Sequence, residues 1–173
     1  MTIAHMKEYG TTVEQIAGVT AKNSFHGSLN PRAQFQAQMT VEEVLASREI
    51  VWPLTLPMCS PIGDGAAALV IVSERKAKEM GLSKPVKVLS SVLLSGFDEG
   101  TESCGIGELA SRNAYEEACL GPKDLSLVEL HDASAPSEIV AYEYLGICGK
   151  GEGGKLIDDG STRLGGRLPV NVS

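Results

Sequence analysis

The sequence has few of the features that mark membrane, secreted, metal-binding or nucleic-acid-binding proteins. Its longest apolar run, residues 66–72, is too short to cross a bilayer, and the N-terminal stretch MTIAHMKEYG lacks the apolar core of a signal peptide. The four cysteines show no CxxC spacing, so we expect reduced thiols in a cytoplasmic protein. Three histidines without a second group of ligands argue against a metal site. The net charge of −7, with scattered lysines and arginines, argues against unassisted nucleic-acid binding.

The first part of the chain carries two helix-start signals. Thr12 with Gln15, and Thr40 with Glu43, have the spacing of a capping box, in which each side chain bonds the other residue's backbone. Between them, residues 25–37 contain several helix breakers and are predicted to form a loop.

Two apolar segments in the middle of the chain are predicted to be strands. Residues 66–73 (AAALVIVS) are apolar on both faces, which suits a sheet covered by helices on either side, and residues 86–94 form a second such segment. A helix is predicted between them, capped by Ser73 and stopped by Gly81. We place a domain boundary near residue 83, dividing the chain into units 1–82 and 83–173.

The second part continues the alternation of helices and strands. A helix is predicted over residues 107–119, and an apolar strand then ends at His131–Asp132. Ser134 and Pro136 begin the next helix, which ends at Gly146. This alternation predicts an α/β fold, in which ligands bind at the carboxyl ends of strands. A His-Asp pair there is either part of such a site or an ordinary polar pair at a helix start.

The last segment, residues 146–166, is dense in glycine without the spacing of a phosphate-binding loop. We predict a mobile connector there, followed by an alternating strand at residues 168–172.

Several motifs together resemble the thiolase superfamily. They are HMKEYGTT, KNSFHGSLNPRAQF and CSPIGDGAAALVIVS in the first half, then HDAS, ExxxYEYLGxC and GEGGKLIDDGSTRLGGRLPVNVS. The nearest branch is that of the sterol-carrier-protein-X type thiolases, thiolase-like lipid-transfer proteins and acetyl-CoA acetyltransferases. The resemblance implies a thiolase-like fold of two similar α/β halves with layered mixed sheets and helices. This chain matches only a central to C-terminal part of it.

The resemblance also implies an activity on acyl-CoA thioesters, either thiolysis or Claisen condensation, with the coenzyme A thioester as substrate and no other cofactor. The family's nucleophilic cysteine context and its Gly-His-Pro and Cys-x-Gly motifs are not found in this sequence. We therefore expect the 173-residue chain to be incomplete and inactive by itself. One alternative is a thiolase-like aldolase subunit that cleaves a β-hydroxy acyl-CoA with a small acyl-CoA-binding partner. Another is a non-catalytic module that binds acyl-CoA or lipid.

The HDAS segment supplies three of the implied site residues. His131 stands where the family has the Asn or His that orders a water near the thioester oxygen, and Asp132 would orient the loop or the imidazole. We assign both as catalytic. Ser134 replaces the phenylalanine of most relatives, and its hydroxyl would either widen the substrate pocket or simply cap the helix.

Two further substrate-binding residues come from other motifs. Ser60 matches the serine that contacts the pantetheine amide, although an ordinary turn serine is equally compatible. Cys104 aligns with a pocket-lining position, or is a small buried hydrophobic residue. Tyr142 and Tyr144 are acid/base candidates by analogy with thiolase-like aldolases, or core residues.

The expected partners follow from the same resemblance. The strands at 66–73 and 86–94 would expose unpaired edges. We expect them to be covered by a second copy of the chain in a homodimer or larger homo-oligomer, by a small acyl-CoA-binding subunit, or by further chain of the same protein. We expect neither a nucleic-acid partner nor a membrane span.

Overall fold

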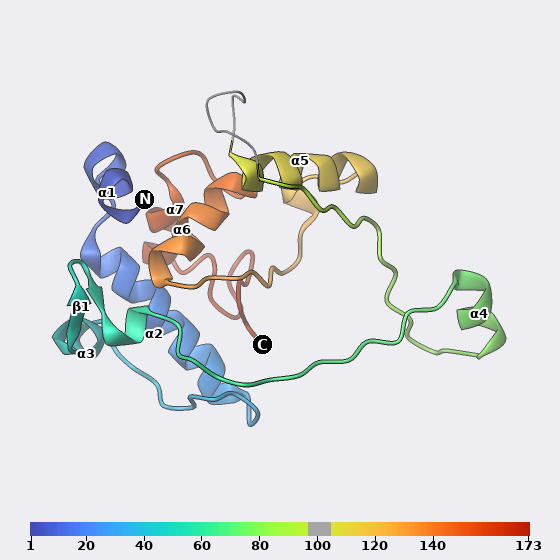
Figure 1. The fold of residues 1–173 in the computed structure, drawn as a ribbon, viewed down its shortest axis with the longest axis horizontal. Helices are drawn as coiled ribbons and strands as arrows, with labels where there is room; N and C mark the ends of the chain where they lie inside the picture. Colours follow the sequence, from blue (N-terminus) through green and yellow to red (C-terminus); the bar gives the residue numbers. More distant parts are fainter. Residues whose placement is uncertain (97–104) are drawn as a thin grey trace.

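The computed structural model describes residues 1–96 and 105–173 (Figure 1). Its elements are α1 (Thr2–Tyr9), α2 (Val13–Leu29), α3 (Val41–Ala46), β1 (Glu49–Val51), β2 (Leu54–Thr55), η1 (Leu56–Met58), α4 (Glu74–Glu79), α5 (Ile106–Ala118), η2 (Pro122–Asp124), α6 (Ala135–Tyr144) and α7 (Gly153–Asp158). The helices α1, α2, α6 and α7 gather into one body, and the chain from residue 61 to residue 96 leaves it as an arm that carries α4 (Figure 1). No helix within these described ranges combines the length and hydrophobicity that crossing a bilayer needs.

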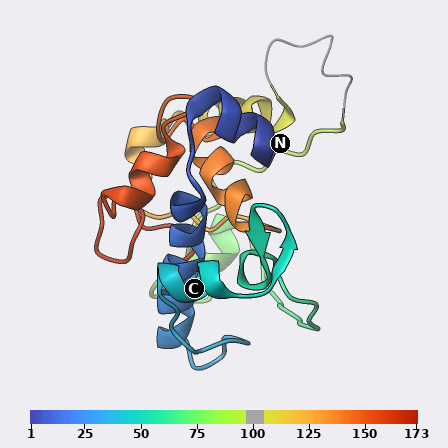
Figure 2. The same cartoon turned by 90° about the vertical axis from the view of Figure 1, so that its left-hand side faces the viewer.

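The central helix is α2, which contacts α3, α6 and α7 (Figure 2). The predicted capping box at its start is confirmed, because Gln15 N donates to Thr12 Oγ1 at 3.2 Å and Thr12 N donates to Gln15 Oε1 at 3.0 Å. The second predicted box, which begins α3, is confirmed in the same way. The loop predicted over residues 25–37 is wrong in its first part, since α2 continues to Leu29. The buried His26 anchors this last turn by a 2.8 Å contact of Nδ1 with Asn171 O.

Two apolar clusters form the core. The larger one joins α2 to α6, α3 and η1 through Ile16, Ala17, Val19, Val44, Met58, Ala135 and Ile139. The smaller one joins α6 to α7 and the C-terminal segment through Tyr142, Leu156 and Val170. The helix α6 belongs to both clusters, so the segment just before it, which contains His131 and Asp132, is attached to a rigid element.

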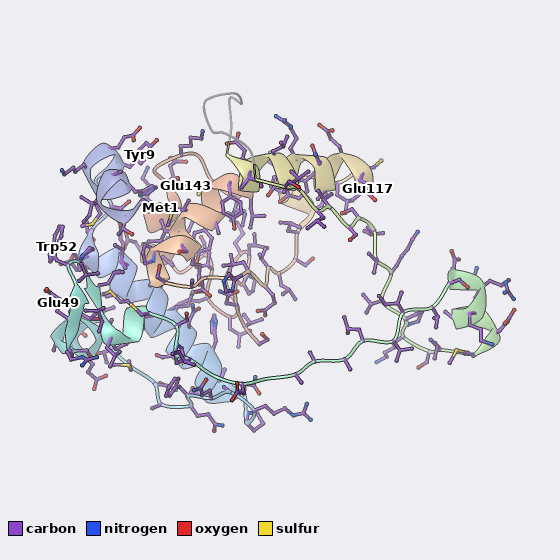
Figure 3. The ribbon with its side chains drawn as sticks, in the orientation of Figure 1. Met1, Tyr9, Glu49, Trp52, Glu117 and Glu143 are labelled. Carbon is purple, nitrogen blue, oxygen red and sulfur yellow. The ribbon has the colours of Figure 1, made fainter. Side chains whose placement is uncertain are left out.

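The N-terminal helix α1 is attached to α6 by polar contacts. His5 Nε2 lies 3.1 Å from the carboxylate of Glu143, and Figure 3 shows Glu143 on the side of the body where Met1 lies. The hairpin of β1 and β2 turns through a cis peptide bond before Pro53, and Trp52 projects from it with 59% of its surface exposed (Figure 3).

The predicted strands at 66–73 and 86–94 are not formed as paired strands. β1 and β2 make the only sheet among the described residues, and the two segments run in the arm without hydrogen-bonded neighbours. Their apolar side chains are open to solvent, with 88% of Leu69 and 94% of Val86 exposed. A strand exists only beside a partner, and these two have none within residues 1–96 and 105–173. The boundary near residue 83 stays a prediction.

The strand expected before His131 is also much shorter than predicted. It consists of one parallel bridge between Val128 and Val170, with Val128 N donating to Pro169 O at 3.0 Å and Asn171 N donating to Val128 O at 2.9 Å. The C-terminal strand predicted at residues 168–172 takes part only through this bridge.

The glycine-dense segment is not simply a connector, because it contains α7. Gly153 and Gly154 are buried at the start of this helix. A Cβ atom on Gly153 would lie 2.5 Å from Ile139 O, so only glycine allows α7 to approach α6 this closely. These glycines therefore serve close packing, and the prediction of a mobile connector is wrong for residues 153–158.

Candidate functional site

The serine turn and the HDAS segment meet in space. Ser60 is 73 residues from Ala133 in sequence, yet its Oγ donates to Ala133 O at 3.0 Å. The backbone N–H of Ser60 donates to the same oxygen at 3.2 Å, and Cys59 and Ser134 form an antiparallel bridge. The two motifs singled out in the sequence therefore lie side by side. Since the hydroxyl proton of Ser60 is used inside the protein, its oxygen remains free to accept a hydrogen bond from a ligand.

A groove of about 560 Å³ lies against this junction. It runs between α2, the loop at residues 35–39, the segment at 56–61 and the start of α6. Its lining is mostly apolar and consists of Val19, Thr20, Asn23, Ser24, Phe35, Ala37, Met39, Leu56, Pro57, Met58, Cys59, Ser60, Pro61, Asp132 and Ala135. An apolar groove with a few polar groups at one end is the usual form of a site for a small organic ligand.

The two predicted catalytic residues differ in their position relative to this groove. Asp132 lines it, whereas His131, the residue before it in the chain, is exposed and is not part of its wall. Burial, together with the nearby negative charge of Glu138, raises the pKa of Asp132 to about 6. Asp132 is thus a carboxyl group that exchanges its proton close to neutral pH, at the edge of the groove.

Behind Asp132 lies a buried polar cluster that connects α2 to α6. The Lys22 ammonium is 2.6 Å from Glu138 Oε1, and the two side chains are almost fully buried. Tyr142 OH donates to Glu138 Oε1, and its oxygen lies 3.2 Å from Thr162 Oγ1, whose hydroxyl can donate to it. Burial lowers the pKa of Lys22, and the adjacent Glu138 opposes this effect.

Of the two tyrosine candidates, Tyr142 is a core residue and Tyr144 is half-buried. Tyr142 is fully buried in the polar cluster, and burial and the charge of Glu138 raise its pKa far above the ordinary range. Tyr144 packs its ring over Gly107, where a Cβ atom would lie 3.1 Å from the ring. Neither residue lines the groove.

Ser134 occupies the N-cap position of α6, as predicted, but its side chain does not cap the helix. Its Oγ lies 3.1 Å from Ser137 Oγ, and it stands beside the groove rather than in its lining. Cys104 lies outside the described residues.

Three cysteines of the described chain are free thiols. Cys59 is half-buried in the groove wall, Cys119 is exposed at the end of α5, and Cys148 is half-buried. Burial, reinforced by the charges of Glu143 and Glu152, raises the pKa of Cys148 to about 12. Within the described ranges, no three His, Cys, Asp or Glu side chains are arranged to hold a metal ion.

The groove residues contributed by α2 and the loop after it were not predicted as site residues. Asn23 and Ser24 lie just ahead of the predicted loop at 25–37, Phe35 lies inside it, and Met39 follows it. A usable signal was present, since Lys22 and Asn23 put polar side chains among the apolar residues Val19, Ala21 and Phe25.

Comparison with known proteins gives the same family along nearly the whole chain. Residues 101–173 match the family described as thiolase C-terminal domain-like. The chain is 42% identical to benzoylsuccinyl-CoA thiolase subunit BbsB of Thauera aromatica, covering 96% of this chain and 44% of that protein. It is 44% identical to an acetyl-CoA acetyltransferase of Methanothermobacter thermautotrophicus, covering 100% of this chain and 46% of that protein. It is 38% identical to sterol carrier protein 2 of Oryctolagus cuniculus, covering 98% of this chain and 32% of that protein.

A solved structure supports the same conclusion for the fold. The structure of the Ltp2-ChsH2(DUF35) aldolase matches with a TM-score of 0.88 and 33% identity, over 98% of this chain and 47% of that one. The predicted thiolase-like α/β fold class is thereby confirmed, even though the two arm segments lack strand partners within the described residues. The chain spans less than half the length of the relatives named above. It belongs to the thiolase superfamily, with its similarity to a central to C-terminal portion of such proteins.

Proposed function

We propose that this chain is part of a thiolase-type enzyme and holds an acyl-CoA thioester, with the acyl group in the groove and the pantetheine arm at the Ser60 turn. The observation that carries this proposal is the double hydrogen bond from Ser60 to Ala133 O. It brings a hydroxyl acceptor to the end of an apolar groove, beside His131 and Asp132. A thioester with an apolar acyl chain and a pantetheine amide requires this combination.

The proposed chemistry begins at the thioester carbonyl oxygen, which gains negative charge when the carbonyl carbon is attacked or when an α-proton leaves. A donor fixed near that oxygen lowers the barrier, typically by a factor of about 10² to 10³. His131 would supply it through an ordered water. The negative charge of Asp132 would help to orient the loop that carries His131. Ser60 Oγ would accept from a pantetheine N–H.

Acyl transfer is the first candidate reaction, because the relatives with the highest identities named above are a thiolase subunit and an acetyltransferase. Aldol cleavage of a β-hydroxy acyl-CoA is the second candidate, because the matching solved structure is that of an aldolase. The two differ in whether an acyl group becomes bound to a cysteine. Incubating the whole enzyme of which this chain is proposed to be part with radiolabelled acetyl-CoA, followed by protein mass spectrometry, distinguishes them, since only acyl transfer leaves an acyl-cysteine.

A partner is proposed for the arm. Its apolar segments, with 91% of Val70 and 96% of Leu93 exposed, form an uncovered surface in this chain. The names of two similar proteins, a thiolase subunit and a two-component aldolase, support a partner subunit. We therefore propose that a second copy or a different subunit covers the arm, and that the isolated chain does not catalyse acetoacetyl-CoA thiolysis. Turnover by the 173-residue chain at the rate of an intact thiolase would contradict this.

Calorimetric titration tests the binding mode. Each buried methylene adds about 0.8 kcal/mol, so binding should tighten about tenfold for two methylenes from acetyl-CoA to butyryl-CoA, and again to hexanoyl-CoA. Ala37→Trp fills the groove from its exposed rim and should abolish this increase while leaving the affinity for free coenzyme A unchanged. The matched control is Ala46→Trp, at an exposed position of α3 that does not line the groove. Equal affinities for all three thioesters in the unmodified chain would refute the proposal.

A further inference from the structure

The fully buried carboxylate of Glu138, in the first turns of α6, is the centre of the polar cluster behind the site. Its Oε1 accepts from the Lys22 ammonium and from Tyr142 OH. Its Oε2 accepts from two amide side chains, Asn23 Nδ2 at 2.8 Å and Asn171 Nδ2 at 3.1 Å. A carboxylate with this many donors is held in one orientation.

The two amides that bond Glu138 Oε2 also hold the His131–Asp132 segment, one on each side. Asn171 Oδ1 accepts from the backbone N–H of Leu130, directly before His131, at 2.9 Å. Asn23 Nδ2 lies 3.3 Å from Asp132 Oδ2 while it donates to Glu138. The same carboxylate oxygen therefore orients both side chains that grip this segment.

Lys22 supplies the charge that balances this carboxylate. Only 1% of its surface is exposed, and besides Glu138 its ammonium contacts Val170 O at 2.8 Å. One ammonium balances one carboxylate, so Asp132 is left as the second negative charge of the cluster. Buried polar groups joined by hydrogen bonds are a common means of fixing a single loop conformation.

We propose that Glu138 and Lys22 are positioning residues. From inside the protein, Glu138 fixes the His131–Asp132 segment on the groove rim through Asn23 and Asn171, and the Lys22 ammonium holds Glu138 in place and balances its charge. Only the role of the His131–Asp132 segment toward a substrate rests on the proposed function, because the contacts that hold the segment are internal to the chain.

Two charged groups act on Asp132, Glu138 on α6 and Lys22 on α2, and Asp132 acts in turn on Tyr142 of α6. Of the surrounding groups, Glu129 in the adjoining segment acts on Lys22, and Arg163 in the C-terminal loop acts on His26. Glu138 and Lys22 act on Asp132 in opposite directions. Their removal must therefore move its titration in opposite directions, which loss of packing does not do.

The test is the titration of the Asp132 carboxyl carbon by NMR in four forms of the chain. Glu138→Gln should lower the midpoint by about one pH unit, because a negative charge is removed while Lys22 remains. Lys22→Met should raise the Asp132 midpoint, because it removes a positive charge that lowers the pKa of Asp132. The Asp132 midpoint of the double variant should lie between those of Glu138→Gln and the unmodified chain. The double variant also leaves no unpaired buried lysine. Lower midpoints in all three variants would show only that Asp132 had become solvated, and would overturn the proposal.

Hydrogen exchange tests the fixing of the segment. The double variant Lys22→Met/Glu138→Ala removes the acceptor shared by the two amides without leaving a buried charge. Exchange at the Leu130 amide should rise at least tenfold relative to the Val128 amide, which bonds Pro169 O instead. An unchanged ratio would contradict the proposal.

A matched control removes an exposed pair. Lys78 and Glu74 on α4 are 2.7 Å apart with 76% and 74% of their side chains exposed. The variant Lys78→Met/Glu74→Gln should leave the Asp132 midpoint and the exchange ratio unchanged. Neither readout uses coenzyme A, so failure of acyl-CoA binding would refute the proposed function and leave this inference standing.

Discussion

Neutralising Asp132 should stabilise the chain at neutral pH. Its pKa rises from an ordinary 3.8 to about 6 on folding, so the folded state holds the proton more tightly than the unfolded state. The stabilisation that this proton provides is complete below about pH 4, and it is lost as the pH rises through about 6. A difference of about two pH units corresponds to about 3 kcal/mol at most. Since Asp132 is partly exposed, screening by solvent reduces this to about 1 kcal/mol.

The variant Asp132→Asn keeps the side-chain shape and an oxygen acceptor for Asn23 but carries no charge. Urea unfolding followed by circular dichroism should show it to be about 1 kcal/mol more stable than the unmodified chain at pH 7.5, and equally stable at pH 4. Asp64→Asn, in the exposed turn after Ser60, is the control and should show no such pH dependence. The reasoning is refuted if Asp132→Asn is the less stable form at pH 7.5, or if the difference is the same at both pH values.

Three other predictions concern the fold around the site. Gly153→Ala places a Cβ atom 2.5 Å from a backbone oxygen of α6 and should cost about 1–3 kcal/mol in urea unfolding, whereas Gly65→Ala, with no atom within 4 Å, should cost less than about 0.5 kcal/mol. Thr12→Ala removes the side-chain cap of α2 and should lower the free energy of unfolding by about 1 kcal/mol; an unchanged urea midpoint would contradict the role of the capping box. Limited iodoacetamide treatment at pH 8 should label the exposed Cys119 long before Cys148, whose pKa near 12 leaves almost no thiolate, and equal labelling in a peptide map would disprove this.

Local signals in the sequence predicted most helix boundaries. The two capping boxes and Ser73 before α4 act within one helical turn, so they do not depend on the rest of the fold. Likewise, Gly146 ends the turn after α6 with a φ of +71°, a conformation that glycine adopts without strain.

Features that depend on distant partners could not be predicted in this way. Residues 25–29 read as a loop, but tertiary contacts of the buried His26 keep them helical. The apolar segment at 66–73 has strand composition, but a strand also needs a neighbour to bond, and composition does not supply one.

The candidate site was predicted in part. Motif resemblance singled out Ser60 and Asp132, which the structure places at one groove, and His131, which is exposed and does not line it. The groove walls and the Glu138 cluster were not predicted, because they combine α2, α6 and the C-terminal segment, and no single stretch of sequence contains them.

The five methionines allow the most direct test of the central claim, that the groove receives the acyl chain of a thioester. Met39 and Met58 line the groove, whereas Met1, Met6 and Met80 do not. The methionine methyl groups are labelled with ¹³C, and the chain is saturated with hexanoyl-CoA. The NMR signals of Met39 and Met58 should then shift, and these methyl groups should show nuclear Overhauser contacts to the acyl methylenes. The account is contradicted if hexanoyl-CoA binds and only the other three methionines respond, or if no methionine signal moves at saturation.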